Sequence, residues 1–313
     1  MEHTTDYGHK PVMLHACMEA LHIRPDGIYV DGTLGRAGHS LAIVQRLTSG
    51  RLIAFDRDES AIAAAEERLA AYRERVILIH SNFSRLGTEL AKHDIDKVDG
   101  MLFDLGVSSP QLDEAARGFS YQQDAPLDMR MDTGAAFTAR ELVNTWDYAQ
   151  LRHILDEYGE ERFASSIARA IVREREKKPI ETTLQLVEVI RASMPAAALR
   201  DKHPAKRSFQ AIRIAVNDEL GELPPMLDAA ADNLASGGRL AVISFHSLED
   251  RIVKEKMREF TSGCICPPSF PVCVCGKTAR MKRITRKPIL ADEEELRDNP
   301  RAHSAKLRVV EKI

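Results

Sequence analysis

The chain of 313 residues has no apolar run approaching the roughly 20 residues that a bilayer-spanning helix needs. Its first residues, MEHTTDYGHKPVML, also lack the basic start and the continuous apolar segment of a secretory signal peptide. These absences argue against a membrane or secreted protein. We therefore expect a cytoplasmic protein without a membrane partner.

A strong charge of one sign is also missing, because the formal net charge is only −3. Such a balance neither favours nor excludes a nucleic-acid partner, so local basic clusters must carry that argument. The segment KTARMKRITRK, residues 277–287, has six basic residues and no acid. It suits a phosphate backbone, or equally a charged sheet edge that discourages aggregation.

Cysteine is scarce and unevenly placed: Cys17 stands alone, whereas Cys264, Cys266, Cys273 and Cys275 lie together in CICPPSFPVCVC. In a reducing compartment such a cluster indicates a metal site more than disulfides. Four thiolates can bind Zn²⁺ tetrahedrally, but Cys-x-Cys is a tighter spacing than structural zinc sites usually have. The alternative is a proline-rich surface loop with reduced thiols.

Apolar segments and helical patterns alternate through the first hundred residues, as in GIYVDG, RLIAFDRD, VILIHSNF and VDGMLFDLG. This alternation predicts a parallel α/β sheet. It stops after FDLGVSSPQLD and returns with GGRLAVISF, while two late segments, RITRKPI and KLRVVEKI, can pair as an antiparallel edge. We predict a discontinuous α/β domain of residues 1–109 and 205–313, and a helical insert of residues 110–204.

The turn DGTLGRAGH follows the first strand and carries glycines at positions 32, 35 and 38. Glycine lets a backbone turn sharply and approach a ligand, and the next helix presents its N-terminus there. The spacing departs from G-x-G-x-x-G, and Asp31 at the strand end would repel a pyrophosphate. A nicotinamide dehydrogenase is therefore disfavoured, and a ligand with a cationic amino-acid end, such as S-adenosylmethionine, is favoured.

The ends of the next strands carry further candidates. Asp56 lies 25 residues after Asp31, where a ribose-binding acid is expected. Asn82 offers polar contacts and Phe83 an apolar contact to adenine. Asp104 can accept hydrogen bonds from the N–H groups of an exocyclic amine, or it can hold only the cofactor. Ordinary turn residues that cap strands are the alternative at any one of these positions.

Several residues are candidates for substrate contact. His203 and His246 can contact or orient a base, or they can anchor their own loops. Arg207, Gln210, Arg213 and Asn217 share one side of the helix in KHPAKRSFQAIRIAVN, and Arg162, Ser166, Arg169 and Arg173 form a similar stripe. Such basic faces are often merely solvated. Phe119, Tyr121 and Met129 can wall a displaced base, or they can pack the insert.

The motifs as a set resemble a known family. HKPVML, DGTLGRAGHS, FDRD, DLGVSSPQLD, RGFSY with PLDMRM, YGEERFASSIARAIV, KHPAKRSFQAIRIAVNDEL and SFHSLEDRIVK occur in the order of the bacterial 16S ribosomal RNA (cytosine-N4)-methyltransferase family (RsmH, formerly MraW). The resemblance spans nearly the whole chain. It implies a class I (Rossmann-like) methyltransferase with an inserted, mainly helical substrate-recognition domain, which methylates a cytidine of the decoding centre in 16S rRNA.

The same resemblance implies a set of site residues. Contacts to S-adenosylmethionine fall on Ala37, Gly38, His39, Asp56, Phe83, Asp104 and Gln111. The resemblance therefore favours Phe83 over Asn82 as a cofactor contact, and it favours the residues after Asp31 over Asp31 itself. No metal ligand is implied, because the cysteine segment occurs in only part of the family.

The implied chemistry is direct methyl transfer at the Asp104 end of the fourth strand. An exocyclic amine needs no covalent adduct on the base, and no cysteine lies at that strand end. The substrate-binding candidates are His203, Arg207, Arg213 and His246, and the partner is 16S rRNA within the small ribosomal subunit. A homodimer is compatible with the sequence. The alternative from another class is a non-catalytic RNA-binding or ribosome assembly factor that keeps the cofactor fold.

Overall fold

The computed structural model describes residues 10–199, 203–264, 266–267 and 270–313. Residues 1–9, used above to argue against a signal peptide, lie outside this description. So do Lys202 of KHPAKR and Ile265, Pro268 and Ser269 of the cysteine segment. The chain forms two compact units, Met1–Gly106 with Leu220–Ile313, and Val107–Glu219. We call them the sheet unit and the insert.

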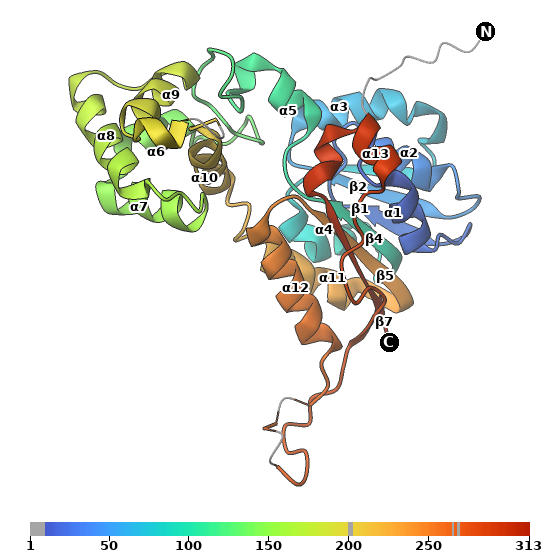
Figure 1. The fold of residues 1–313 in the computed structure, drawn as a ribbon. Helices are drawn as coiled ribbons and strands as arrows, with labels where there is room; N and C mark the ends of the chain where they lie inside the picture. Colours follow the sequence, from blue (N-terminus) through green and yellow to red (C-terminus); the bar gives the residue numbers. More distant parts are fainter. Residues whose placement is uncertain (1–9, 200–202, 265, 268–269) are drawn as a thin grey trace. The chain divides into compact units, whose positions relative to one another are not determined.

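The sheet unit is built on seven strands in the order β3-β2-β1-β4-β5-β7-β6 (Figure 1). Their bounds are β1 (Ile28–Asp31), β2 (Arg51–Asp56), β3 (Val76–His80), β4 (Val98–Asp104), β5 (Leu234–Ser244), β6 (Met281–Arg283) and β7 (Lys306–Lys312). Neighbours from β3 to β5 are parallel, whereas β7 runs antiparallel to β5 and β6. The predicted parallel sheet and an antiparallel edge are confirmed. The first strand of that edge is displaced from the prediction, because β6 overlaps the predicted segment RITRKPI only at Arg283 and Ile289 forms an isolated bridge to Leu307.

Strand order reverses between β1 and β4, which makes a switch point at the carboxyl ends of these two strands. In open α/β sheets, ligands bind in the crevice outside this point, since the loops that follow the two strands diverge there. The ends of β1 and β4 therefore mark where the functional residues of the sheet unit should gather.

Alternating side chains of the strands enter two separate cores. Tyr29, Leu52 and Leu102 pack on one face of the sheet with α1 (Leu14–Leu21), α2 (Gly38–Val44), α3 (Glu59–Arg68) and α13 (Glu293–Asp298). Val30, Ile53 and Phe103 pack on the other face with α4 (Leu86–Lys92), α11 (Leu223–Asn233) and α12 (Ser247–Thr261). Strands buried on both faces explain why the sequence reads as short continuous apolar runs.

The glycines of NLASGG, residues 233–238, follow a helical segment and would suit a left-handed helix end, but they lie inside a strand. Helix α11 already ends at Asn233, and Gly237 and Gly238 lie within β5, where its pairing with β4 shifts register between Val98 and Gly100. Gly237 has a φ of +79°, and a Cβ on Gly238 would lie 2.9 Å from the carbonyl oxygen of Ala235. The glycines therefore permit an irregularity in the strand.

The insert contains α5 (Ser109–Asp113), α6 (Ala139–Thr145), α7 (Tyr148–Glu157), α8 (Ala164–Lys177), α9 (Thr183–Ala192) and α10 (Lys206–Asn217). Short 3₁₀ helices occur in both units: η1 (Ala70–Tyr72), η2 (Phe83–Arg85), η3 (Ala115–Arg117), η4 (Ala196–Leu199) and η5 (Pro300–Ser304). Reciprocal capping boxes begin α6, α7 and α9, which explains where these helices start. None of the helices in the described ranges is long and apolar enough to span a bilayer.

The insert is larger than the predicted residues 110–204, because it extends to Glu219. The predicted bounds place α10 in the α/β domain, whereas the structure places it in the insert. Its residues Phe209, Ala211 and Ile212 are buried in the same core as α6, α7 and α8. The sequence showed an amphipathic helix at this position but not which of the two cores its apolar face would join.

Candidate active site

Asp31, Asp56 and Asp104 end β1, β2 and β4, as the sequence predicted. The Asp31 carboxylate is buried and accepts hydrogen bonds from the backbone N–H of Thr33 (3.1 Å) and the hydroxyl of Ser40 (2.7 Å). Burial raises the pKa of Asp31. This carboxylate ties the glycine turn to α2, which supports a positioning role more than direct ligand contact.

The three glycines of the turn have different roles. A Cβ on Gly32 would lie 2.1 Å from the ring of Phe103, and one on Gly38 would lie 2.3 Å from Pro11, so packing requires glycine at both positions. Gly35 has a φ of +48°, and no atom of the described chain lies within 4 Å of its Cβ position. Packing therefore accounts for glycine at positions 32 and 38, and of the three only Gly35 has open space at its Cβ position. Contact of the turn's backbone with a ligand stays a prediction.

Asp56 links the end of β2 to this turn. Its carboxylate accepts hydrogen bonds from the N–H of Gly35 (2.8 Å) and the N–H of Asp58 (2.9 Å). Burial raises the pKa of Asp56 to about 6. A carboxylate held in this way beside open space is suited to accept hydrogen bonds from a ribose diol.

The two candidates that follow β3, Asn82 and Phe83, have different roles. The side-chain oxygen of Asn82 accepts a hydrogen bond from the N–H of Ser84 (3.0 Å), so Asn82 caps η2. The ring of Phe83 lies edge-on to Phe103, with centroids 6.0 Å apart, and the guanidinium of Arg57 lies 5.5 Å from its centroid. Phe83 is thus an aromatic ring in a fixed orientation, suited to a planar purine.

Asp104 is the carboxylate at the switch point. Its backbone N–H donates to the hydroxyl of Thr33 (2.6 Å), and its buried Oδ1 has no hydrogen-bond partner in the described part of the chain. Its Oδ2 lies 3.8 Å from Nδ1 of His39, whose Nε2 donates to the carbonyl oxygen of Val12 (3.0 Å). Burial raises the pKa of Asp104 to about 6. An unsatisfied buried acceptor here fits a cationic ligand or an amine.

Two acids that the sequence analysis did not identify act electrostatically on Asp104. Glu249, in the first turn of α12, is buried and accepts from the N–H groups of Phe245 (2.8 Å) and His246 (3.3 Å). Glu295 of α13 accepts from the N–H of Met13. The charges of Glu249 and Glu295 both contribute to the raised pKa of Asp104. The capping pattern H-S-L-E signalled Glu249, whereas nothing in the local sequence signalled Glu295.

His246 lies at the end of β5 as predicted, but the structure engages it in the start of α12. It is the N-cap of this helix, and its Nε2 lies 3.1 Å from Oε1 of Glu249. Both of its ring nitrogens are buried without a hydrogen-bond partner in the described part of the chain, so a contact to a base stays a prediction.

Within the insert, two predicted residues come together. The rings of Tyr121 and His203 stack with centroids 4.3 Å apart, and Phe209 packs edge-on to Tyr121 at 5.7 Å. Burial lowers the pKa of His203, which favours the neutral ring. Phe119 and Met129, in contrast, are buried in the insert core, so these two residues pack the insert and do not form an exposed wall.

The polar side of α10 is largely used within the insert. Arg213 forms a two-pronged ion pair with Glu219, with N–O distances of 2.8 and 2.9 Å. Asn217 accepts from the N–H of Met131 and donates to the carbonyl oxygen of Met129, both at 2.7 Å. The exposed Arg207 donates to the carbonyl oxygen of Glu160 (2.8 Å). Arg207 is therefore a better candidate for substrate contact than Arg213.

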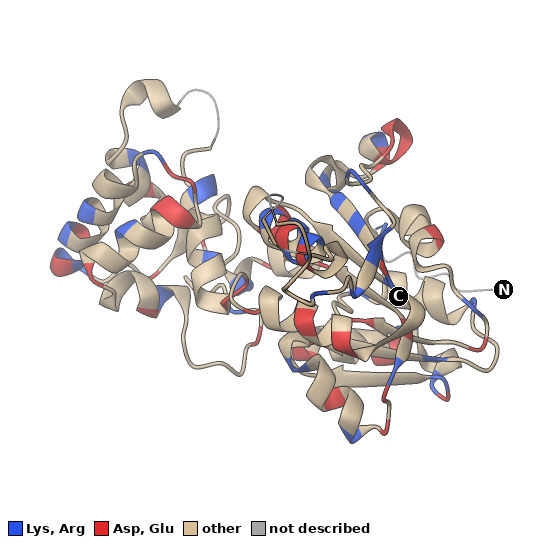
Figure 2. Cartoon of the chain, turned by 90° about the horizontal axis from the view of Figure 1, so that it is seen from below, with Lys and Arg blue, Asp and Glu red and all other residues tan. Residues whose placement is uncertain are grey.

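The remaining predicted residues lie on α5, on α8 or just before α8. Gln111 is buried, and its side-chain oxygen accepts from the N–H of Ser108 (3.0 Å) in a capping box. Arg162 and Arg169 are exposed, while Arg173 pairs with Glu174 at 2.9 Å. Figure 2 shows acidic residues (red) interspersed with basic residues (blue) on the helices of the insert. The described insert therefore presents mixed charge and not a uniformly basic face.

Comparison with known proteins agrees with this geometry. Residues 6–313 match the MraW methylase family. A ribosomal RNA small subunit methyltransferase H from Heliobacterium modesticaldum is 55% identical over 310 residues, which cover 98% of this chain and 99% of that protein. Proteins of the same name from Paenibacillus sp. and Clostridioides difficile are 55% and 54% identical, and each match covers 98% of this chain and 100% of the relative.

The match extends over both units, and the strand order is that of a doubly wound sheet with its carboxylates at the switch point. The chain therefore belongs to the MraW methylase family and is an S-adenosylmethionine-dependent methyltransferase with a class I, Rossmann-like fold.

Proposed function

We propose that this enzyme methylates the N4 amine of one cytidine in the decoding centre of 16S rRNA, within the small ribosomal subunit in the cytoplasm. Its relatives share the name ribosomal RNA small subunit methyltransferase H, which supports an rRNA of the small subunit as the substrate. The observation that carries the proposal is Asp104, a buried carboxylate with an unsatisfied oxygen at the end of β4. A site that transfers a methyl group to an amine needs such an acceptor.

The fit to S-adenosylmethionine rests on residues of the sheet unit. Asp56 would accept from the ribose hydroxyls, Ala37 to His39 would line the amino-acid end, and Phe83 would contact adenine. Gln111 of the insert is the further contact that the family resemblance implies. When bound, this cofactor supplies an electrophilic methyl group on a sulfonium.

Asp104 would act on the substrate amine. An exocyclic amine conjugated with its ring is a poor nucleophile, and an acceptor that holds its N–H group localises the lone pair towards the methyl group. Asp104 and His39 together can hold the proton that the amine loses, because Nδ1 of His39 lies 3.8 Å from the carboxylate. With a pKa of about 6, Asp104 is mainly ionised at neutral pH and ready to accept.

Transfer would be direct, without a covalent enzyme–base adduct. Cys17 is the sole cysteine outside the 264–275 segment; it is buried, and burial raises its pKa well above the usual range. A thiol in this state is a poor nucleophile. Cys17→Ala should therefore keep its methyl-transfer rate, measured at a temperature where the variant is folded, and complete loss would contradict direct transfer.

RNA contacts are assigned to the exposed residues of the insert. His203 and Tyr121 form a stacked aromatic pair on which a base can stack, and Arg207 is exposed nearby in the sequence. We retain Arg213 as a weaker candidate, because Glu219 already engages it. We also retain His246, whose ring nitrogens have no hydrogen-bond partner among the described residues.

The test is transfer of a labelled methyl group to three substrates that lack the modification: naked ribosomal RNA, purified small subunits and whole ribosomes. Nucleoside analysis then identifies the product. We expect label in N4-methylcytidine from small subunits. Label in another nucleoside would refute the assigned position, and no label in any substrate despite tight cofactor binding would favour a non-catalytic assembly factor. Asp104→Ala should abolish transfer while ribosome binding persists.

A further inference from the structure

The four clustered cysteines lie in the connection between α12 and β6, and none of them is among the residues of the proposed active site. Figure 1 shows this connection projecting beyond both elements. It runs from Ser262 to Arg280 without a helix or strand in its described part. Connections without secondary structure are uncommon above roughly 12–15 residues, and this one is longer.

The described residues of this connection form no apolar core of their own. Phe270 is 50% exposed, Val272 69% and Val274 73% exposed. Small segments that cannot bury apolar side chains depend on a disulfide or a metal ion for a defined structure. None of the four cysteines forms a disulfide in the described part of the chain, so a disulfide does not supply this constraint.

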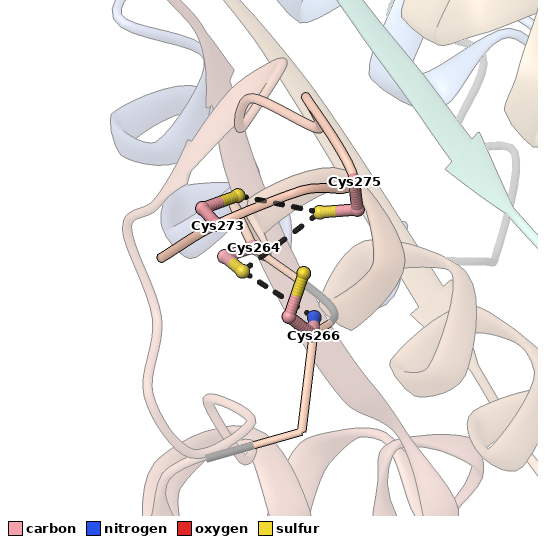
Figure 3. Close-up of side chains that lie close together, drawn as sticks. All are labelled: Cys264, Cys266, Cys273 and Cys275. Atoms are coloured by element: carbon pink, nitrogen blue, oxygen red, sulfur yellow. Dashed lines mark hydrogen bonds between the residues drawn. The ribbon is translucent and has the colours of Figure 1, made fainter. Parts of the chain in front are cut away.

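The sulfur atoms converge despite the tight Cys-x-Cys spacing. The Sγ atoms of Cys264, Cys266, Cys273 and Cys275 all lie within 4.8 Å of one another (Figure 3). Sγ of Cys275 lies 3.6 Å from that of Cys273 and 3.8 Å from that of Cys264. A regular tetrahedron with Zn–S bonds of about 2.3 Å has edges of about 3.8 Å. Both distances match this edge, one within a Cys-x-Cys pair and the other between the pairs.

The backbone around the sulfurs is also arranged as in a thiolate site. The N–H of Cys266 lies 3.3 Å from Sγ of Cys264 and points to it, and the N–H of Val274 donates to Sγ of Cys266 at 3.4 Å. Such donors stabilise the negative charge of metal-bound sulfur. Gly276 directly follows the last cysteine and has a φ of +61°, which lets the chain turn away there.

We propose that Cys264, Cys266, Cys273 and Cys275 bind one structural Zn²⁺ ion. Four sulfur ligands complete a tetrahedron and leave no open position, so the ion holds the connection between α12 and β6 in place and takes no part in methyl transfer. An iron–sulfur cluster is disfavoured, because it distributes its cysteines around several metal atoms and needs sulfurs farther apart. The ligand set is soft and sulfur-only, which excludes Mg²⁺ and Ca²⁺.

The test is the metal content of the full-length protein, purified without chelators from zinc-supplemented medium. We expect one zinc ion per chain in the wild type, and its loss in Cys264→Ser/Cys273→Ser, which removes one ligand from each pair. Cys17→Ala is the matched control, because it removes a cysteine outside the cluster, and it should keep the zinc. Circular dichroism of each variant establishes that the sheet unit is folded.

Cobalt gives an independent readout. One equivalent of Co²⁺ added to the metal-free protein should produce the sulfur-to-cobalt charge-transfer and ligand-field bands of a tetrahedral site, and Zn²⁺ should abolish them. All four thiols should resist alkylation until the metal is removed. The proposal is overturned if the wild type holds no zinc and gives no such spectrum, if it holds iron in place of zinc, or if the control variant loses the metal as the double variant does.

Discussion

At the scale of single residues, burial controls the chemistry of Asp56 and Asp104, since it raises the pKa of each to about 6. Their folded-state pKa values exceed the ordinary value, so protonation of these acids favours the folded state. That contribution to stability is complete below about pH 4 and is lost as the pH rises through about 6. Binding a cationic ligand has the opposite requirement, because it needs the ionised carboxylates.

Methyl transfer should therefore depend on pH through Asp104. We expect kcat/KM to rise with pH through about 6 and then to level off, as Asp104 loses its proton. Asp104→Asn cannot ionise, so it should lose most of the activity, and its residual rate should lack this dependence. The measurement is initial rates from pH 5 to 8 on a fixed substrate.

The control for this profile is Asp113→Asn, which changes an acid on α5 outside the proposed carboxylate set. It should keep the wild-type rate and the wild-type pH dependence. An unchanged profile in Asp104→Asn would assign the ionisation to another group, with Asp56 the first candidate because its pKa is raised to a similar value.

Asp56 should matter mainly for cofactor affinity. Loss of a hydrogen bond to a charged group costs about 1.5–3 kcal/mol, which is roughly a 10- to 150-fold change in affinity. Asp56→Asn should weaken S-adenosylmethionine binding by this factor in isothermal titration calorimetry. Asn82→Ser is the matched control, because serine can still cap η2, and it should bind as the wild type does. Equal affinities of Asp56→Asn and the wild type would remove Asp56 from the site.

At the scale of elements, the sequence predicted what local pattern and strand order determine. Alternating apolar segments identified the strands, and the acids that follow them identified the carboxyl edge of the sheet. The pattern could not show that Gly32 and Gly38 pack against Phe103 and Pro11, because both contacts join distant parts of the chain. Glu295 was missed for the same reason.

Helix α10 shows the same limit most clearly. Its basic side resembled an RNA-binding face, but Arg213 and Glu219 are a pair six residues apart that meet only because the chain turns after Asn217. Their side chains are 16% and 7% exposed, so this pair is largely removed from solvent. A structural role of Arg213 can therefore be separated from an RNA-binding role by experiment.

Arg213→Ala should destabilise the insert, because it leaves the buried charge of Glu219 without its partner, at a cost of about 3 kcal/mol. Arg207→Ala removes an exposed arginine of the same helix and should change stability by less than about 0.5 kcal/mol. Urea unfolding followed by fluorescence reports this unit, since Trp146 is the single tryptophan of the chain and lies in the insert.

The double variant Arg213→Met/Glu219→Met should regain most of the lost stability, since it removes both charges and keeps similar volume. RNA binding is measured in parallel on the folded variants. If Arg213→Ala unfolds as the wild type does but loses RNA affinity, Arg213 is a substrate residue and the structural interpretation is wrong.

At the scale of the whole molecule, the chain has separate cores in its two units. The two apolar clusters of the sheet unit contain residues from both of its segments, and the third cluster lies entirely within the insert. A unit with its own core can unfold as a cooperative block. The proposed cofactor contacts lie in the sheet unit, with the exception of Gln111.

Thermal unfolding should therefore show two transitions, one seen by both circular dichroism and Trp146 fluorescence, and one seen by circular dichroism alone. S-adenosylmethionine at about 100 times its Kd adds about 2.7 kcal/mol to the stability of the unit that binds it. On addition of S-adenosylmethionine, we expect the largest rise in midpoint temperature for the transition that Trp146 fluorescence does not report. Asp56→Asn should abolish this rise. The proposed Gln111 contact predicts a smaller shift at Trp146, which Gln111→Ala should remove. Both probes could instead report one transition with the same midpoint, with and without the cofactor. That result would show that the two cores unfold together and would contradict their independence.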